Sequence, residues 1–72
     1  MNWRNHIESD PMILHGKPCI KWTRIPAAMI LGYLASDYNF DAIIREFPDI
    51  TKTDISACLD YARDLATYSV AA

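Results

Sequence analysis

The chain has 72 residues, 51% of them hydrophobic, and a formal net charge of −2. This length allows one small domain, whose core alone leaves little stability to spare, and the negative charge argues against a protein that simply coats nucleic acid. The first 24 residues nevertheless hold four basic and two acidic side chains, a local charge of +2, so we expect attraction for an anion mainly in this third.

A small β element is expected over residues 1–24. Two short apolar runs, PMIL and CIKW, flank the segment HGKP, which predicts a hairpin with a four-residue connection. Gly16 suits a positive φ in that connection, and Pro18 begins the second strand. The segment NWRNHIE is a further candidate strand. Alternation in CIKWT places Ile20 and Trp22 on one face and Cys19, Lys21 and Thr23 on the other.

Three helices are expected over residues 25–68. Pro26 fits the first turn of a helix that ends near Ser36–Asp37. Asn39 suits the N-cap of a short second helix, which Pro48 stops. At the start of the third helix, Thr51 and the carboxylate three residues later predict a relative of the capping box. The apolar stripe of that helix comprises Ile55, Cys58, Leu59, Ala62, Leu65 and Ala66.

The second and third helices are joined by about four residues, as in a helix-turn-helix. The expected fold is therefore α+β and mostly α, a small N-terminal β hairpin followed by a three-helix bundle of homeodomain-like or winged type. We expect one domain, 1–72, in which residues 69–72 form a frayed tail.

The sequence lacks the residues that several kinds of chemistry require. Lys17 follows a glycine, but Pro11 and Pro18 stand where a phosphate-binding loop needs glycine and Ser or Thr. Cys19 and Cys58 are expected to be buried, reduced thiols. No metal-site spacing and no set of nucleophile, base and orienting group is present, so we expect no metal, cofactor, small-molecule substrate or enzymatic activity. With no apolar run at the N-terminus, we expect neither a signal peptide nor a membrane span, and a cytoplasmic location.

The stretch from Asp10 to Pro26 resembles the motif D-P-x-I-x-x-G-K-P-x-I-x-G-T-R-I-P of the domain of unknown function 433 family of short bacterial and archaeal proteins. Two departures stand out: Trp22 replaces a usual glycine, and Ser36–Asp37 replaces the glycine that usually ends the first helix. The matching residues are Asp10, Pro11, Ile13, Gly16, Lys17, Pro18, Ile20, Thr23, Arg24, Ile25 and Pro26, followed downstream by Ile43, Ile44, Glu46, Phe47 and Pro48 and by Asp54, Ile55, Ala57, Leu59, Tyr61 and Ala62.

This resemblance implies a helix-turn-helix fold and the role of antitoxin in a type II toxin–antitoxin pair whose toxin is a PIN-like ribonuclease. The expected function is therefore to bind that toxin, as a homodimer, and to bind double-stranded DNA of its own operon. The alternative is a dimeric protein-interaction adaptor with the same fold and no DNA binding, because a fold does not determine a function.

Two sets of residues are candidates for these contacts. The cations of the partner-binding set are expected to bind phosphate or the carboxylates of a nuclease. The alternative is that Arg24 ties its own hairpin to helix carbonyls and that both lysines are solvated. The DNA-binding set is opposed by Asp54, Asp60 and Asp64, which repel phosphate. The partner-binding set is Lys17, Lys21, Arg24, Trp3 and Trp22, and the DNA-binding set is Thr51, Lys52, Thr53 and Ser56.

Overall fold

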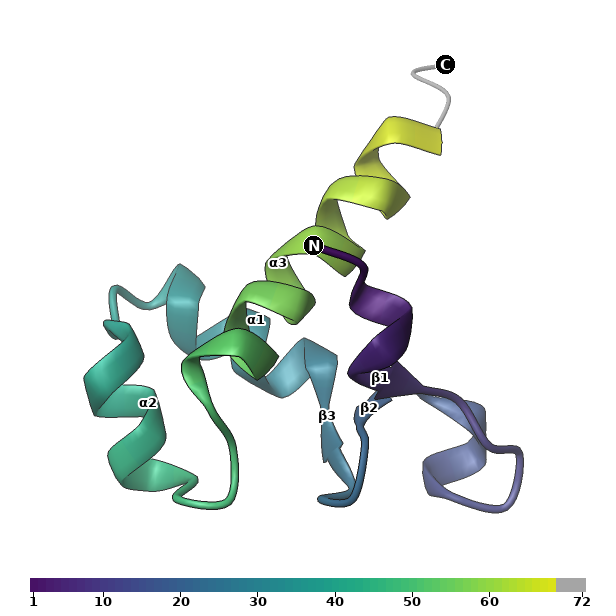
Figure 1. Ribbon diagram of the computed structural model, residues 1–72, viewed down its shortest axis with the longest axis horizontal. Coiled ribbons are helices and arrows are strands. Elements are labelled where there is room, and N and C mark those ends of the chain that lie inside the picture. The colour runs from purple at the N-terminus through teal and green to yellow at the C-terminus, as the bar shows by residue number, and fades with distance from the viewer. Residues whose placement is uncertain (69–72) are drawn as a thin grey trace.

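Three short strands and three α-helices follow one another in the computed structural model, which describes residues 1–68 (Figure 1). The fold is α+β, as expected, and the predicted frayed tail at 69–72 lies outside the described residues. Two short 3₁₀ turns, Trp3–Asn5 and Leu14–Gly16, lie among the strands. The strands are β1 (Ile7–Glu8), β2 (Cys19–Ile20) and β3 (Ile25–Pro26), and the helices are α1 (Ala27–Ala35), α2 (Phe40–Glu46) and α3 (Lys52–Tyr68).

The strands form one antiparallel sheet in the order β1-β2-β3, with Ile20 opposite both Ile7 and Ile25. The predicted pairing of PMIL with CIKW is wrong. Residues 11–14 form no strand, because the chain takes positive φ at three successive positions, 14 to 16, and turns away. The candidate strand at residues 2–8 is confirmed for Ile7–Glu8. The β element also extends to Pro26, past the expected boundary at residue 24.

The alternation predicted for CIKWT is also wrong. Cys19 and Ile20 are both buried, because β2 is the central strand. The strand ends at Ile20 and the chain turns at once, so Trp22 lies in solvent rather than on the face of Ile20. The predicted positive φ of Gly16 is confirmed at 82°.

The predicted helix ends are largely confirmed. α1 begins directly after Pro26 and ends at Ala35. The Asn39 side chain accepts a hydrogen bond of 2.8 Å from the N–H of Ala42, which caps α2. At the start of α3, Thr51 Oγ1 accepts from the N–H of Asp54 at 3.1 Å, and Asp54 Oδ2 accepts from the N–H of Thr51 at 2.9 Å. This reciprocal pair is the relative of the capping box that the sequence predicts.

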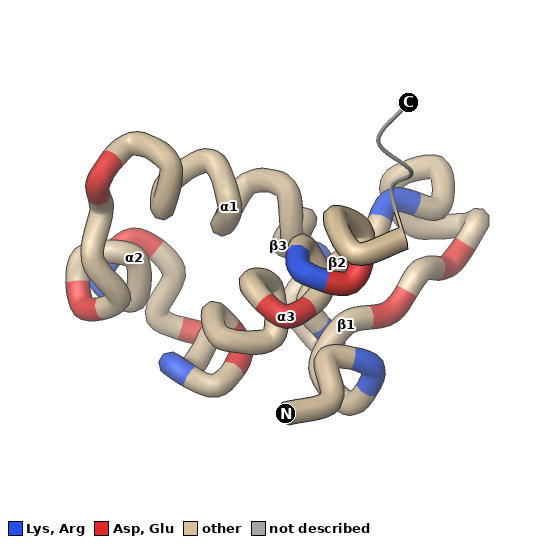
Figure 2. Tube along the Cα trace, turned by 90° about the horizontal axis from the view of Figure 1, so that it is seen from above, with Lys and Arg blue, Asp and Glu red and all other residues tan. Residues whose placement is uncertain are grey.

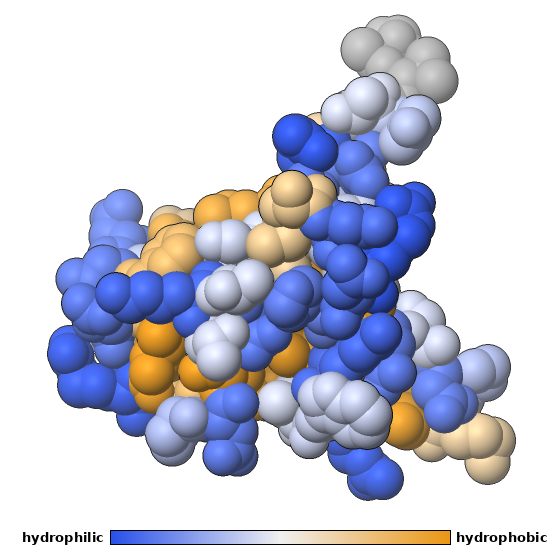
Figure 3. Space-filling model, viewed as in Figure 1, coloured by the Kyte–Doolittle hydropathy of each residue, from blue (hydrophilic) through white to orange (hydrophobic). Residues whose placement is uncertain are grey.

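The core lies where α1, α2 and α3 meet the sheet, and its largest fully buried side chains are Ile20, Ile30, Ile43, Ile55 and Cys58. On the face shown in Figure 3, apolar side chains reach the surface between α2 and α3. The predicted stripe of α3 is confirmed in its first half, where Ala57 is buried as well. Leu59 and Leu65, further along the same predicted stripe, are about half exposed.

The end of α1 is a Schellman motif built without glycine. The N–H of Asp37 donates to the carbonyl of Leu34, and the N–H of Tyr38 donates to that of Tyr33, each at 3.1 Å. Asp37 has a φ of 70° at the position where glycine is favoured. We expect Asp37→Gly to raise the free energy of unfolding by about 0.5–1 kcal/mol, because glycine adopts this backbone without strain. Urea denaturation measures the change, and Asp37→Ala, which keeps the strain, serves as the control.

Burial of the Cys58 thiol links stability to alkaline pH. Burial, together with the nearby Asp54 carboxylate, raises the pKa of Cys58 from 9.0 to about 12. Between these values the unfolded chain has lost the thiol proton and the folded chain keeps it. We therefore expect Cys58 to lower the free energy of unfolding by up to about 1.4 kcal/mol per pH unit above pH 9. Urea denaturation from pH 8 to 10.5 should show Cys58→Ala losing less stability than the wild type; parallel losses would contradict this.

Candidate functional site

The connection between β2 and β3, residues Lys21 to Arg24, is the most unusual surface feature of the chain, and we name it the KWTR turn. The hydroxyl of Thr23 donates to the carbonyl of Ile20 at 2.9 Å and accepts from the N–H of Ile25 at 3.1 Å. One side chain thereby fixes both ends of the turn. Because Thr23 holds the turn, the side chains of Lys21, Trp22 and Arg24 are not needed to hold it.

Two non-glycine residues of this turn have left-handed backbones, with φ of 72° at Trp22 and 58° at Arg24. Such a conformation costs roughly 1–2 kcal/mol per residue, because the Cβ approaches the following carbonyl. Strained residues of this kind are concentrated at functional sites. Trp22 is 97% exposed, so its ring contributes little to the core. The turn therefore holds a large aromatic side chain in solvent on a strained backbone.

The two cations of the turn, and Lys17 nearby in the sequence, are not paired with other groups of the described residues. Within residues 1–68, the side chains of Lys17, Lys21 and Arg24 make no hydrogen bond or ion pair. Arg24 therefore does not tie its hairpin to the carbonyls of a described helix. Its guanidinium is available for a planar, two-bond contact with a carboxylate.

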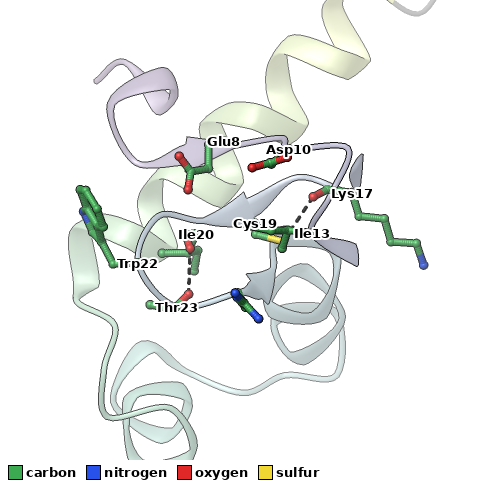
Figure 4. A pocket seen from close by; sticks show the side chains of 9 residues that line it. Glu8, Asp10, Ile13, Lys17, Cys19, Ile20, Trp22 and Thr23 are labelled. Atoms are coloured by element: carbon green, nitrogen blue, oxygen red, sulfur yellow. Dashed lines mark hydrogen bonds between the residues drawn. The ribbon is translucent and has the colours of Figure 1, made fainter. Parts of the chain in front are cut away.

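One side of the turn borders a hollow of about 220 Å³, which we name the motif pocket (Figure 4). Except for Glu8, all its lining residues come from the stretch 10–26 that carries the family motif. The carboxylates of Glu8 and Asp10 lie at one edge, whereas the Lys17 side chain extends away from the pocket. The lining residues are Glu8, Asp10, Ile13, Lys17, Cys19, Ile20, Trp22, Thr23 and Arg24.

Cys19 lies in the wall of the motif pocket but is a poor nucleophile. Its Sγ donates to the carbonyl of Lys17 at 3.2 Å. Burial, and secondarily the Glu8 carboxylate, raises the pKa of the Cys19 thiol. Because the thiolate is the reactive form, a raised pKa suppresses nucleophilic chemistry here. The motif pocket is therefore suited to binding by its shape and charge rather than to nucleophilic chemistry by Cys19.

The other side of the turn borders a second hollow, of about 440 Å³, which reaches the start of α3. Trp22 and Thr23 line both hollows and form the ridge between them. Lys21 and Thr51 both line this second hollow, so the structure places members of the predicted partner-binding and DNA-binding sets around one hollow. Its lining residues are Asn5, His6, Lys21, Trp22, Thr23, Asp49, Thr51 and Asp54.

The DNA-binding set occupies the first turn of α3, where it is partly engaged by the protein itself. The Thr51 hydroxyl is used by the capping box, and Lys52 Nζ lies 3.4 Å from Asp41 Oδ1. Thr53 is exposed and Ser56 is half-buried. Acidic residues are distributed along α2 and α3 (Figure 2), so the surroundings of Lys52 are not strongly positive.

Trp3 lies apart from the KWTR turn and packs on α3. Its ring meets that of Tyr61 edge to face, with 4.9 Å between centroids. Its Nε1 donates to Asp64 Oδ2 at 2.6 Å, and its backbone N–H donates to Asp60 Oδ2 at 3.2 Å. The side chain predicted to anchor a partner therefore has intramolecular contacts of its own.

The aspartates of α3 have a role that the sequence analysis missed. Asp60 and Asp64 hold Trp3, and Asp54 Oδ1 lies 3.1 Å from His6 Nδ1. The sequence interprets them as groups that repel phosphate; in the structure all three also fasten the N-terminal segment to the helix. The i, i+4 spacing of Asp60 and Asp64 was a signal that both lie on one side of α3.

Two further properties describe residues 1–68. No three side chains of His, Cys, Asp or Glu within this range converge to form a metal site, and this includes His6, His15 and Cys19, the two histidines and one of the two cysteines of the chain. None of the helices in the same range is long and apolar enough to cross a membrane.

The arrangement defines a small α+β domain whose sequence motif folds into an exposed turn and an adjoining pocket. A sequence model of the family described as "Protein of unknown function (DUF433)" matches residues 7–62, well over half of the chain. The chain therefore belongs to this family, which confirms the resemblance seen in the motif. No curated protein and no solved structure matches the chain.

Proposed function

We propose that this chain is the antitoxin of a type II toxin–antitoxin pair and that it binds a PIN-like ribonuclease through the KWTR turn. The observation that supports this most is the exposed ring of Trp22 on a backbone of positive φ. An aromatic side chain that adds little to the fold despite its strain is suited to a contact with another molecule. Tryptophan and arginine are also the residues that most often dominate protein interfaces.

Charge complements this contact. A metal-dependent ribonuclease of this kind gathers carboxylates at its active site, and Arg24 has no internal partner among the described residues. In the proposed complex, Trp22 anchors the turn and Arg24 meets the acidic site, which blocks access of RNA. Lys17 and Lys21 flank this contact and steer the acidic partner toward it.

The test is a pull-down from native cell extract with the tagged chain at low and high salt, followed by mass identification of the retained proteins. We expect a stoichiometric small ribonuclease that survives high salt, whose activity the chain inhibits. Trp22→Ala and Arg24→Gln should each lose the ribonuclease. Met12→Ala changes an exposed apolar residue outside the KWTR turn and should retain the ribonuclease. Recovery of the wild type without a ribonuclease would refute the proposal.

Binding to the DNA of its own operon is the second part of the proposal, and the exposure of Lys52 and Thr53 at the start of α3 favours it. Retention on the upstream DNA should decrease in the double variant Lys52→Glu, Thr53→Ala. Its dependence on salt should be shallow, because few phosphates can be neutralised by each chain. A control with Arg45→Glu changes the charge equally on α2 and should retain DNA.

The alternative is a protein-interaction adaptor that does not bind DNA. The contact of Lys52 with Asp41 favours this alternative, because the ion pair already neutralises the main cation of the DNA-binding set. An adaptor would show no specific retention on the upstream DNA, so the double variant would have nothing to lose.

A further inference from the structure

The outer half of α3, residues 59–68, extends beyond the body of the domain (Figure 1). The helix has 17 residues, about 26 Å at 1.5 Å per residue. All of its buried side chains, those of Ile55, Ala57 and Cys58, precede residue 59. Helical stability in proteins comes mainly from packing of an apolar face. In this half, Trp3 covers one side through its contact with Tyr61, whereas Leu59 and Leu65 are left exposed.

The outer half is nevertheless apolar where it leaves the body. Leu59, Leu65 and Tyr68 are 44%, 56% and 79% exposed. Leu65 and Tyr68 also line a groove of about 380 Å³ with Trp3, Arg4, Tyr61 and Asp64. Ala62 and Ala66 lie one turn apart on the same segment and allow another helix to approach closely. A continuous apolar surface on so small a domain marks an interface.

The charges beside this surface are balanced. Arg63 Nη2 lies 2.7 Å from Asp60 Oδ1 and 4.0 Å from Asp64 Oδ1, and Arg4 Nη1 lies 3.8 Å from Asp64 Oδ2. Three charges of α3 and Arg4 of the Trp3–Asn5 turn thus form a chain of ion pairs with two cations and two anions. A partner with a strong charge of either sign gains nothing here, whereas a surface with both signs can complement a copy of itself. Such self-complementarity is what a two-fold interface requires.

We propose that the outer half of α3 packs antiparallel on the same segment of a second copy of this chain. A two-fold axis perpendicular to the helix places Leu65 and Tyr68 of each copy against the other and opposes the two helix dipoles. The groove shares no lining residue with the motif pocket, so a dimer formed here leaves the KWTR turn free. The inference stands independently of the proposed antitoxin role.

Sedimentation equilibrium between about 1 and 200 µM tests the dimer, with a chain mass of 8.2 kDa. We expect twice this mass for the wild type, and for Leu65→Glu a dissociation constant at least about tenfold higher. Met12→Glu adds the same charge at an 89% exposed residue outside this surface and should remain dimeric. Circular dichroism checks folding, and Tyr68→Glu replaces Leu65→Glu should that variant unfold. A monomeric wild type, or a dimer indifferent to Leu65→Glu, would overturn the proposal.

Crosslinking tests whether this face of α3 meets the same face of a second copy. The native Cys19 and Cys58 are both buried, so a new surface cysteine reports on its own surroundings. Ala66→Cys lies on the exposed outer half of α3, next to Leu65, and should form a covalent dimer on mild oxidation faster than Met12→Cys. Equal or slower crosslinking of Ala66→Cys would show that this face does not meet its copy. Neither readout involves the ribonuclease, so failure here is distinct from failure of the proposed function.

Discussion

Replacement of Trp22 with glycine is expected to stabilise the fold and, at the same time, to weaken binding of the partner. The backbone at this position has a φ of 72°, which glycine adopts without a Cβ penalty. Because the Trp22 ring is exposed, it adds little buried apolar area to the fold. We therefore expect Trp22→Gly to raise the free energy of unfolding by about 0.5–1 kcal/mol. Loss of a tryptophan hot spot costs at least about 2 kcal/mol of binding, or roughly 30-fold in affinity.

Two measurements separate these effects. Urea denaturation followed by circular dichroism gives the stability, and titration of the retained partner gives the affinity. Trp22→Ala is the matched control, because alanine removes the ring but keeps the strain. It should lose affinity as Trp22→Gly does, without the gain in stability. Unchanged affinity in both variants would remove the KWTR turn from the proposed interface, and a less stable Trp22→Gly would show that the ring supports the fold.

The helix ends were predictable because each depends on side chains within a few residues. Asn39 reaches the N–H three residues ahead, and Thr51 and Asp54 exchange hydrogen bonds over the same distance. The sheet was not predictable in this way. Its strands have two residues each, too few to show a period, and Ile7 pairs with Ile20 across a loop whose course depends on left-handed backbones. No local pattern distinguishes that pairing from the expected hairpin.

The candidate site was predictable in its residues but not in its geometry. Residue type and the family motif identify Lys21, Trp22 and Arg24 as candidates. The replacement of the family glycine by Trp22 also indicates this turn. Whether that position keeps a positive φ depends on the β2–β3 pairing and on the hydrogen bonds of Thr23. The placement of Lys21 and Thr51 around one hollow depends on tertiary structure, which periodicity within a helix does not show.

Truncation of the Trp3 side chain to alanine is expected to lower the free energy of unfolding by about 2–4 kcal/mol. The ring is half-buried against Tyr61, and truncation of a large aromatic leaves a cavity in addition to the lost contact. A domain of 72 residues has only a few kcal/mol of stability from its core, so Trp3→Ala should be partly unfolded at 37 °C. Urea denaturation at 10 °C and thermal denaturation measure the loss, and a cost below about 1 kcal/mol would contradict the observed contacts.

The variant Trp3→Phe separates the contribution of the aromatic ring from that of its hydrogen bond to Asp64. Phenylalanine keeps an aromatic contact with Tyr61 but cannot donate to Asp64, so we expect a loss of about 1–2 kcal/mol. Paired with Asp64→Ala in a double-mutant cycle, it should show a coupling energy of at least about 0.5 kcal/mol. The same variant tests the sequence-based expectation that Trp3 binds a partner. Because its ring is already committed to α3, we expect folded Trp3→Phe to retain the ribonuclease that Trp22→Ala loses, which would assign Trp3 to the fold and Trp22 to the interface.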